Sequence, residues 1–414
     1  MDLRSTLAGQ VDASLDGLIT TTRRLVAVAS PNPPSDTAAI ALVAEALLGE
    51  IPGMTVEVVE PAPRVKSLIG RLKSGRPGRR LIFNGHLDTF PILEHLPWTV
   101  PPLAGVLKDG KLFGRGVCDM KGGIACSLLA ASLLAGHRDA WSGEIVLTLA
   151  GDEENMGSLG TGWMLEHIAH ARGDANICGD VGSPRVVRFG EKGLMWVEVE
   201  ATGSPAHGAH VHRGINAIDR LRAALDRLKD LETIPFQAPP GVTQAIAQAR
   251  PISEPLSGAG ESETLQRVTV NIGTIEGGAS PNLVPTHALA RADIRLPVGI
   301  TTDVLAAKLD EWLAPLEGVS WRAIRRFEPS FTPPDHEIVL RTAKVAEEVL
   351  GTAAAVNMRV GGSDSRWYRP AGVPTVVLGL TPFNMGGADE YVLIDELLAV
   401  AKIHTLTAYD FLTG

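Results

Sequence analysis

Three short apolar runs in the first half of the chain each end in a loop that carries acidic or histidine side chains. These segments are residues 81–88, 144–154 and 175–180. Helical patterns separate them, and alternation of strands with helices predicts an α/β fold built on a sheet. Such sheets place ligands beyond the carboxyl ends of their strands, so we expect the three loops to meet at one edge.

The first of these loops contains His86 and Asp88, two residues apart. In extended backbone both side chains leave the same face, which suits a metal-ligand histidine oriented by a nearby carboxylate. A histidine and an aspartate at a strand end also form an ordinary hydrogen-bonded loop pair. By itself this segment leaves both interpretations open.

Acidic or histidine side chains recur at the ends of predicted strands, and this recurrence favours a metal centre over chance. The residues are His86, Asp119, Glu153, Glu154 and Asp180. Imidazole nitrogen and carboxylate oxygen suit Zn²⁺, Mn²⁺ or Co²⁺. Adjacent carboxylates can point in different directions, so one of Glu153 and Glu154 can coordinate while the other moves protons. The spacing does not decide which.

The length of 414 residues exceeds what one core usually serves, so two domains are expected. From residue 188 a βαββαβ order predicts a small ferredoxin-like domain inserted into the first. Within it, the Pro/Gly/Gln-rich stretch 235–260 is expected to be a loop. The predicted boundaries are 1–187 and 329–414 for the two parts of the catalytic domain and 188–328 for the insert.

Composition narrows the functional classes. The net charge is -9, and the absence of basic runs argues against nucleic-acid binding. No stretch approaches the roughly 20 apolar residues of a membrane span, and the N-terminus lacks the apolar core of a signal peptide. Three irregularly spaced cysteines do not form a disulfide framework. We therefore expect a cytoplasmic protein with no nucleic-acid or membrane partner.

Several motifs together resemble one metallopeptidase and amidohydrolase family, which includes acetylornithine deacetylase, succinyl-diaminopimelate desuccinylase and glutamate carboxypeptidase. Its three signatures are similar to residues 86–91, 114–122 and 152–154. Residues 30–34 and 361–364 resemble further landmarks, so the resemblance covers nearly the whole chain. It implies a catalytic domain with a central mixed sheet flanked by helices, and an inserted lid that also forms a homodimer.

The resemblance also implies a ligand set. His86 and Asp180 would bind one metal, Asp119 would bridge two metals, and Glu154 would bind the second. Asp88 would orient the imidazole of His86.

Further roles follow from the same resemblance. Glu153 would be the general base that moves a proton from water to the leaving amine. His207 would reach into the partner subunit's site and polarise the scissile carbonyl, although a surface loop histidine is the competing interpretation. Asn282, Arg295 and Ser363 would bind substrate. For Arg295, an ordinary surface salt bridge is an equal alternative.

One position departs from the family pattern. A histidine three residues before an Asp-Glu-Tyr normally completes the second metal site, and here Gly386 holds that position. By this resemblance the second site would keep only Asp119 and Glu154, unless another residue or the substrate fills the open position. We therefore expect one divalent metal per subunit, Mn²⁺ or Zn²⁺ with Co²⁺ as an alternative. Its core ligands would be His86, Asp119 and Asp180.

The sequence thus predicts a metal-dependent hydrolase that cleaves a C–N bond, amide or aryl amine, in a small carboxylate-bearing substrate. The missing histidine leaves an alternative within the family, an aromatic aminohydrolase similar to 5-nitroanthranilate aminohydrolase. A non-catalytic binding protein that kept the fold is the alternative of another class. Retention of Glu153 argues against it, because a binding protein needs no base beside a ligand.

Overall fold

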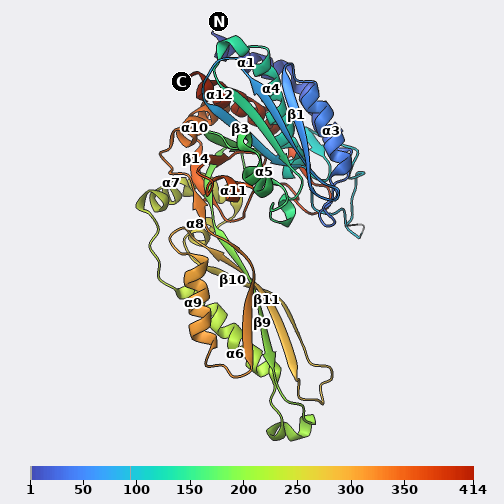
Figure 1. Cartoon of the computed structure of the whole chain (residues 1–414), viewed down its shortest axis with the longest axis vertical. Helices are drawn as coiled ribbons and strands as arrows, with labels where there is room; N and C mark the ends of the chain where they lie inside the picture. Colours follow the sequence, from blue (N-terminus) through green and yellow to red (C-terminus); the bar gives the residue numbers. More distant parts are fainter. Residues whose placement is uncertain (1, 94) are drawn as a thin grey trace.

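The computed structural model describes residues 2–93 and 95–414, and these form a large and a small body (Figure 1). The large body contains a nine-stranded mixed sheet flanked by helices, which confirms the predicted α/β fold. Its strand order is β1-β2-β6-β3-β7-β15-β8-β13, with β14 paired to β8. The bounds are β1 Met54–Ala62, β2 Val65–Lys73, β3 Arg80–His86, β6 Glu144–Ala150, β7 Ala175–Cys178, β8 Val186–Glu191, β13 Ser330–Phe331, β14 Ala355–Arg359 and β15 Thr375–Val377.

Successive side chains of β3 point to opposite faces of the sheet, so they pack in two hydrophobic cores, one on each face. Leu81 and Phe83 pack with the larger helix layer, whereas Ile82 packs with α5 and α11 on the opposite face. The helices of the larger layer are α1 Leu3–Ala13, α2 Leu15–Val26, α3 Ala38–Gly49, α4 Gly122–Ala135, α10 Glu337–Leu350 and α12 Ile394–Thr413. The opposite layer contains α5 Thr161–His167 and α11 Ser365–Tyr368.

The sheet edge that carries the predicted ligands is set by parallel pairing. Strand β3 lies between β6 and β7 and runs parallel to both, with His86 opposite Ala150 and Asn84 opposite Cys178. The loops that follow these three strands therefore leave from the same edge.

A three-stranded sheet brings the C-terminal part of the chain to this edge. The predicted hairpin at residues 106–113 is present as β4 (Val106–Lys108) and β5 (Lys111–Phe113). Strand β16 (Tyr391–Leu393) adds to β5, with Tyr391 opposite Phe113. The loop that contains Gly386 precedes β16 and so lies near η1 (Val117–Lys121), which carries Asp119.

The small body has the predicted βαββαβ order and its own core. Its antiparallel sheet runs β10-β11-β9-β12, packed against α6 and α9. The elements are β9 Gly193–Thr202, α6 Ala217–Asp230, β10 Thr269–Gly277, β11 His287–Leu296, α9 Thr302–Leu313 and β12 Val319–Phe327. The boundaries 1–187, 188–328 and 329–414 stay a prediction, and β8 runs across the first of them.

The expected loop at 235–260 was wrong. Most of it is helix α7 (Pro240–Ser257), followed by α8 (Glu261–Leu265), and α7 packs on β14 of the large body. Its buried residues have helical spacing: Val242, Ala245, Ile246, Ala249 and Ser253. Proline is compatible with the first turn of a helix, so Pro240 does not oppose this start. The high Pro and Gly content concealed the helical periodicity.

The expectation that no stretch approaches the length of a membrane span was wrong. Helix α4 and the turn before it form an apolar segment, Val117–Ala135, that is long enough to cross a membrane by length and composition. In the structure 83% of its most apolar window is buried, and α4 packs against α12 and the sheet. Its apolar character therefore belongs to the core of the large body.

His404 on α12 provides a pH test of this packing. The side chain is fully buried and Nε2 lies 2.8 Å from the carbonyl oxygen of Leu378. Burial lowers the pKa of His404 from 6.5 to about 4. As the pH falls, the unfolded chain therefore takes up a proton at a higher pH than the folded chain does. The free energy of unfolding therefore decreases as the pH falls from about 6.5 towards about 4.

We expect chemical denaturation to show this loss. Between pH 7 and pH 5 the unfolding free energy should fall by about 2 kcal/mol more in wild type than in His404→Gln, which cannot take up the proton. Equal slopes for the two proteins would contradict the assignment.

Candidate metal centre

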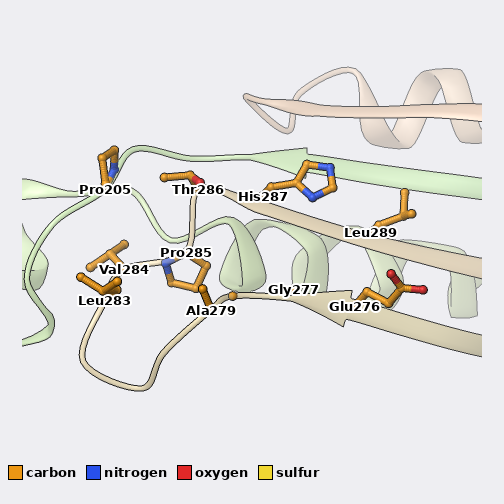
Figure 2. A pocket seen from close by; sticks show the side chains of 11 residues that line it. Pro205, Glu276, Gly277, Ala279, Leu283, Val284, Pro285, Thr286, His287 and Leu289 are labelled. Carbon is orange, nitrogen blue, oxygen red and sulfur yellow. The ribbon is translucent and has the colours of Figure 1, made fainter.

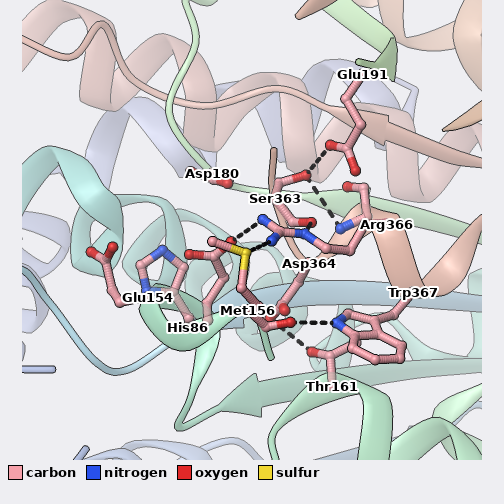
Figure 3. Close-up of polar contacts among 12 residues, drawn as sticks. His86, Glu154, Met156, Thr161, Asp180, Glu191, Ser363, Asp364, Arg366 and Trp367 are labelled. Carbon is pink, nitrogen blue, oxygen red and sulfur yellow. Dashed lines mark hydrogen bonds and ion pairs between the residues drawn. The ribbon is translucent and has the colours of Figure 1, made fainter. Parts of the chain in front are cut away.

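Three of the predicted ligands converge at the sheet edge. His86 ends β3, Asp119 lies in η1, and Asp180 follows β7. One ligand atom from each lies within 4.8 Å of the others, and all three residues are buried. Figure 3 shows His86 with Glu154 to its left and Asp180 above it in this view. Three protein ligands with an open position are sufficient for a catalytic zinc site.

The imidazole of His86 is held in one orientation. Nδ1 lies 2.9 Å from the backbone carbonyl oxygen of Asp88, whereas the nearest carboxylate oxygen of Asp88 is 3.7 Å away. The carbonyl therefore orients the ring, and Nε2 faces Oδ1 of Asp119 at 3.0 Å. Burial lowers the pKa of His86, but the hydrogen bond and charge of Asp119 outweigh it, so the pKa is raised well above its usual value.

The carboxylate of Asp88 instead organises the loop that carries the two glutamates. It accepts hydrogen bonds from the backbone N–H groups of Glu153 at 3.2 Å and Glu154 at 3.0 Å. The side-chain amide of Asn32 donates to it at 2.8 Å. Asp88 is fully buried, so these bonds tie the loop after β6 to the loop after β3.

Glu153 is buried and has a charged partner. Its Oε1 accepts a hydrogen bond from Nη2 of Arg366 at 2.7 Å (Figure 3). Burial raises the pKa of Glu153 to about 8, and the guanidinium of Arg366 opposes this rise. A carboxylate with such a pKa can accept and release a proton near neutral pH.

Glu154, next to Glu153 in the chain, has fewer hydrogen-bond partners for its carboxylate than Glu153 has. Among the described residues its buried Oε1 has no hydrogen-bond partner. Burial, and then the charge of Asp119, raise the pKa of Glu154 to about 10. An orphaned acceptor beside buried carboxylates fits a bound cation, since unpaired buried charge is costly. The donors are nitrogen and oxygen, which suit the predicted metals.

Asp180 has a guanidinium partner that no sequence pattern predicted. Its Oδ2 lies 3.0 Å from Nη1 of Arg359, and its Oδ1 accepts from the backbone N–H of Val181. Arg359 lies two residues before the predicted landmark at 361–364 and Arg366 lies two residues after it, yet neither is marked by a local pattern. Only the pairing of β14 with β8 places Arg359 at this edge.

Gly386 offers no ligand and lies in a conformation suited to glycine. Its φ is +74°, and among the described residues only the ring of Phe90 lies within 4 Å of an added Cβ, at 3.7 Å. Its carbonyl accepts from Nη2 of Arg115 at 3.0 Å. Glu390 near the end of this loop is also engaged, with Arg115 and with the backbone N–H of Cys118. The described part of the loop thus supplies no side chain in place of the histidine.

The structure brings His207 and Asn282 together, but away from this centre. Gly208 donates its N–H to the carbonyl of Asn282 at 2.7 Å, and His207 pairs with Leu283. The segment between β9 and α6, which contains His207, lies at the end of the small body remote from the large sheet (Figure 1).

Arg295 and Ser363 have partners within the chain. Nε of Arg295 lies 2.9 and 3.0 Å from the two carboxylate oxygens of Asp293. Ser363 is fully buried and donates to Glu191 at 2.8 Å (Figure 3). The catalytic role of His207 and substrate binding by Asn282, Arg295 and Ser363 stay predictions.

Comparison with known proteins decides the family. A model described as peptidase family M20/M25/M40 matches residues 82–410. The chain belongs to this family. Its homologues are metal-dependent amide hydrolases, which confirms the prediction of a metal-dependent hydrolase and sets aside a non-catalytic binding protein.

Individual relatives agree with this membership. Succinyl-diaminopimelate desuccinylase of Methylorubrum populi is 31% identical over 358 residues, 83% of this chain and 84% of that protein. The desuccinylase of Gluconacetobacter diazotrophicus is 29% identical over 96% of this chain and 98% of its own. Among solved structures, the M20 metallo-carboxypeptidase Sso-CP2 of Sulfolobus solfataricus has a TM-score of 0.79 at 18% identity, covering 96% and 99% of the chains. YXEP of Bacillus subtilis, described as a dinuclear metal-binding M20 peptidase, has a TM-score of 0.65 at 15% identity, covering 97% and 99%.

The ligand cluster makes a direct prediction about metal binding. Mn²⁺ or Zn²⁺ should raise the melting temperature of the wild-type protein, since a ligand at 100 times its Kd adds about 2.7 kcal/mol of stability. His86→Ala should lose this response. His167→Ala, at an exposed histidine on α5, should keep it. An equal metal-induced shift in His86→Ala would contradict the assignment.

Proposed function

We propose that this M20-family enzyme hydrolyses a C–N bond in a small carboxylate-bearing substrate at a centre built on His86, Asp119 and Asp180. The observation that carries the proposal is the convergence of these three buried ligands within 4.8 Å, beside the buried carboxylate of Glu153. A divalent ion bound there would supply Lewis-acid chemistry, lowering the pKa of water and polarising a carbonyl. We propose Mn²⁺ or Zn²⁺ as that ion.

In this proposal Glu153 moves the proton. The residue accepts it from the attacking water and delivers it to the leaving nitrogen, so its raised pKa is suited to both steps. The guanidinium of Arg366 holds one oxygen of Glu153, which leaves the other free for this transfer. Glu154 is proposed to contribute a further ligand through its orphaned oxygen.

We further propose that each subunit holds one ion. By the family resemblance, a histidine of the second site is expected where Gly386 stands, and the described residues around it offer no substitute. The amide type of C–N bond is favoured because several relatives near 30% identity over most of the chain are desuccinylases. Glycine at position 386 is the observation that keeps an aryl amine substrate as the second candidate.

Substitution of the proposed base tests the reaction. Glu153→Gln should lower kcat by about 10²- to 10⁴-fold, the usual contribution of a general base, and should keep the metal-induced rise in melting temperature. N-succinyl and other N-acyl amino acids should be hydrolysed in preference to aminobenzoates. A loss smaller than about tenfold would remove Glu153 from this role, and selective turnover of aminobenzoates would favour the second candidate.

We propose that the enzyme is a homodimer formed through the small body. In one chain His207 lies far from the metal centre, so its predicted role needs a second copy. Large apolar side chains are exposed near it, with Val211 at 66%, Ile275 at 61% and Leu283 at 51%. Strand β10 is an edge strand, which presents unpaired backbone groups to another chain.

A hollow beside this edge belongs to the same surface. It has a volume of about 580 Å³ and is lined by residues 276–279 and 283–287 together with Pro205 and Leu289. Figure 2 shows Leu283, Val284 and Pro285 on the loop that leads into β11, and Glu276 on β10. We propose that the second copy of the chain covers this surface.

Mixing two inactive variants tests both the dimer and His207. His207→Ala and Glu153→Gln should each be inactive alone. After mixing and exchange of subunits, about one quarter of wild-type activity should return, since half of the dimers are mixed and each mixed dimer has one intact site. No recovery, with exchange verified by mass, would contradict a role for His207 across the interface.

The cytoplasmic localisation also stays a proposal. All three cysteines, Cys118, Cys126 and Cys178, are free and buried. Free thiols are typical of a reducing compartment.

A further inference from the structure

The end of strand β12 contacts the loop that carries Glu153 and Glu154. This strand is the last of the small body, and three residues later the chain enters β13 of the large sheet. Arg325 and Phe327 lie in its last three residues. Both residues therefore lie at the junction of the two bodies, just before the chain passes from the small body into the large one.

Arg325 reaches the loop directly. Its Nη2 donates to Oδ1 of Asn155 at 2.8 Å, and Asn155 follows Glu154 in the chain. The pairing of β12 with β9 shifts register between Ala323 and Arg325, so Arg325 rather than Ile324 lies opposite Trp196. A β-bulge of this kind re-aims the side chains that follow it. Among the described residues Arg325 forms no salt bridge.

Phe327 reaches the loop through two residues of α11. Its ring packs edge-on against Trp367, with centroids 5.5 Å apart and an angle of 81° between the rings. The guanidinium carbon of Arg366 lies 5.4 Å from the centroid of Phe327. Edge-to-face and cation–π contacts depend on geometry, so they fix the orientation of these partners.

The same two residues hold the catalytic loop. Arg366 bonds Oε1 of Glu153 at 2.7 Å and lies 2.8 Å from the sulfur of Met156. Nε1 of Trp367 donates to the carbonyl of Met156 at 2.9 Å. Figure 3 shows Arg366 and Trp367 on either side of Met156. Contacts from β12 thus reach the loop at Glu153, Asn155 and Met156.

We propose that Arg325 and Phe327 are positioning residues, which hold loop 153–156 and the guanidinium of Arg366 so that Glu153 keeps its place beside the metal ligands. Neither side chain needs to touch substrate for this role. The proposal rests on the proposed function for its effect on catalysis, but the mechanical part concerns this chain alone. Placement of a reacting group matters steeply, because an error of about 1 Å can cost 10²-fold in rate.

The test uses Phe327→Leu and Arg325→Met in the full chain. Arg326→Gln is the matched control, because Arg326 lies on the same strand but pairs with Asp303 of α9. Phe327→Tyr is the conservative variant that keeps the ring. In steady-state assays on an N-acyl amino acid, the two test variants should lose about tenfold in kcat with KM within about twofold. Both Arg326→Gln and Phe327→Tyr should match wild type.

Hydrogen exchange of the metal-free proteins supplies a readout independent of activity. Amides of residues 153–156 should exchange faster in the two test variants, while β3 and β6 keep wild-type protection. Unchanged exchange in this loop would overturn the proposal, and so would a rise in KM at constant kcat, which indicates substrate contact. If Glu153→Gln kept full activity the proposed function would fail, yet the exchange data would still decide whether β12 orders the loop.

Discussion

The parallel pairing of β3 with β6 and β7 is the contact on which the rest of the site depends. It sets the ends of three strands side by side, so His86, Glu153 and Asp180 arrive at one edge although they are far apart in sequence. Parallel neighbours require crossover connections, and the helices that make them cover both faces of the sheet. The edge is therefore buried, and acidic groups within it cannot rely on water.

Several carboxylates are buried at this edge, and their negative charges need positively charged partners to be stable there. Arg359 and Arg366 supply part of this positive charge, at Asp180 and Glu153, and an oxygen of Glu154 remains without a partner among the described residues. A buried charge is tolerated when it is paired or coordinates a metal. A divalent ion would neutralise the negative charge that remains unpaired. Asp88 keeps the arrangement rigid, because its carboxylate binds the backbone of the two glutamates and its carbonyl orients His86.

Much of this could be predicted from the sequence, because the signals are local. Residues 81–88, 144–154 and 175–180 each show an apolar run that ends in an acidic loop. This pattern predicts where each of the three strands ends. The hairpin at Asp109-Gly110 was legible for the same reason. The helix at 240–257 was not, because its Pro and Gly residues resemble those of a loop although its buried positions repeat with helical spacing.

The partners of the ligands could not be predicted. Arg359 is 179 residues from Asp180 in the sequence, and Arg366 is 213 residues from Glu153. Such pairs exist only after the sheet has formed. The orienting contact on His86 is also a matter of geometry: spacing pointed to the carboxylate of Asp88, whereas its backbone carbonyl lies at hydrogen-bond distance.

The most direct measurement is a crystal structure of the enzyme with Zn²⁺, with anomalous diffraction recorded at the zinc edge. We expect one anomalous peak per chain, between His86, Asp119 and Asp180. A second peak of equal height between Asp119 and Glu154, or no peak beside His86, would contradict this expectation.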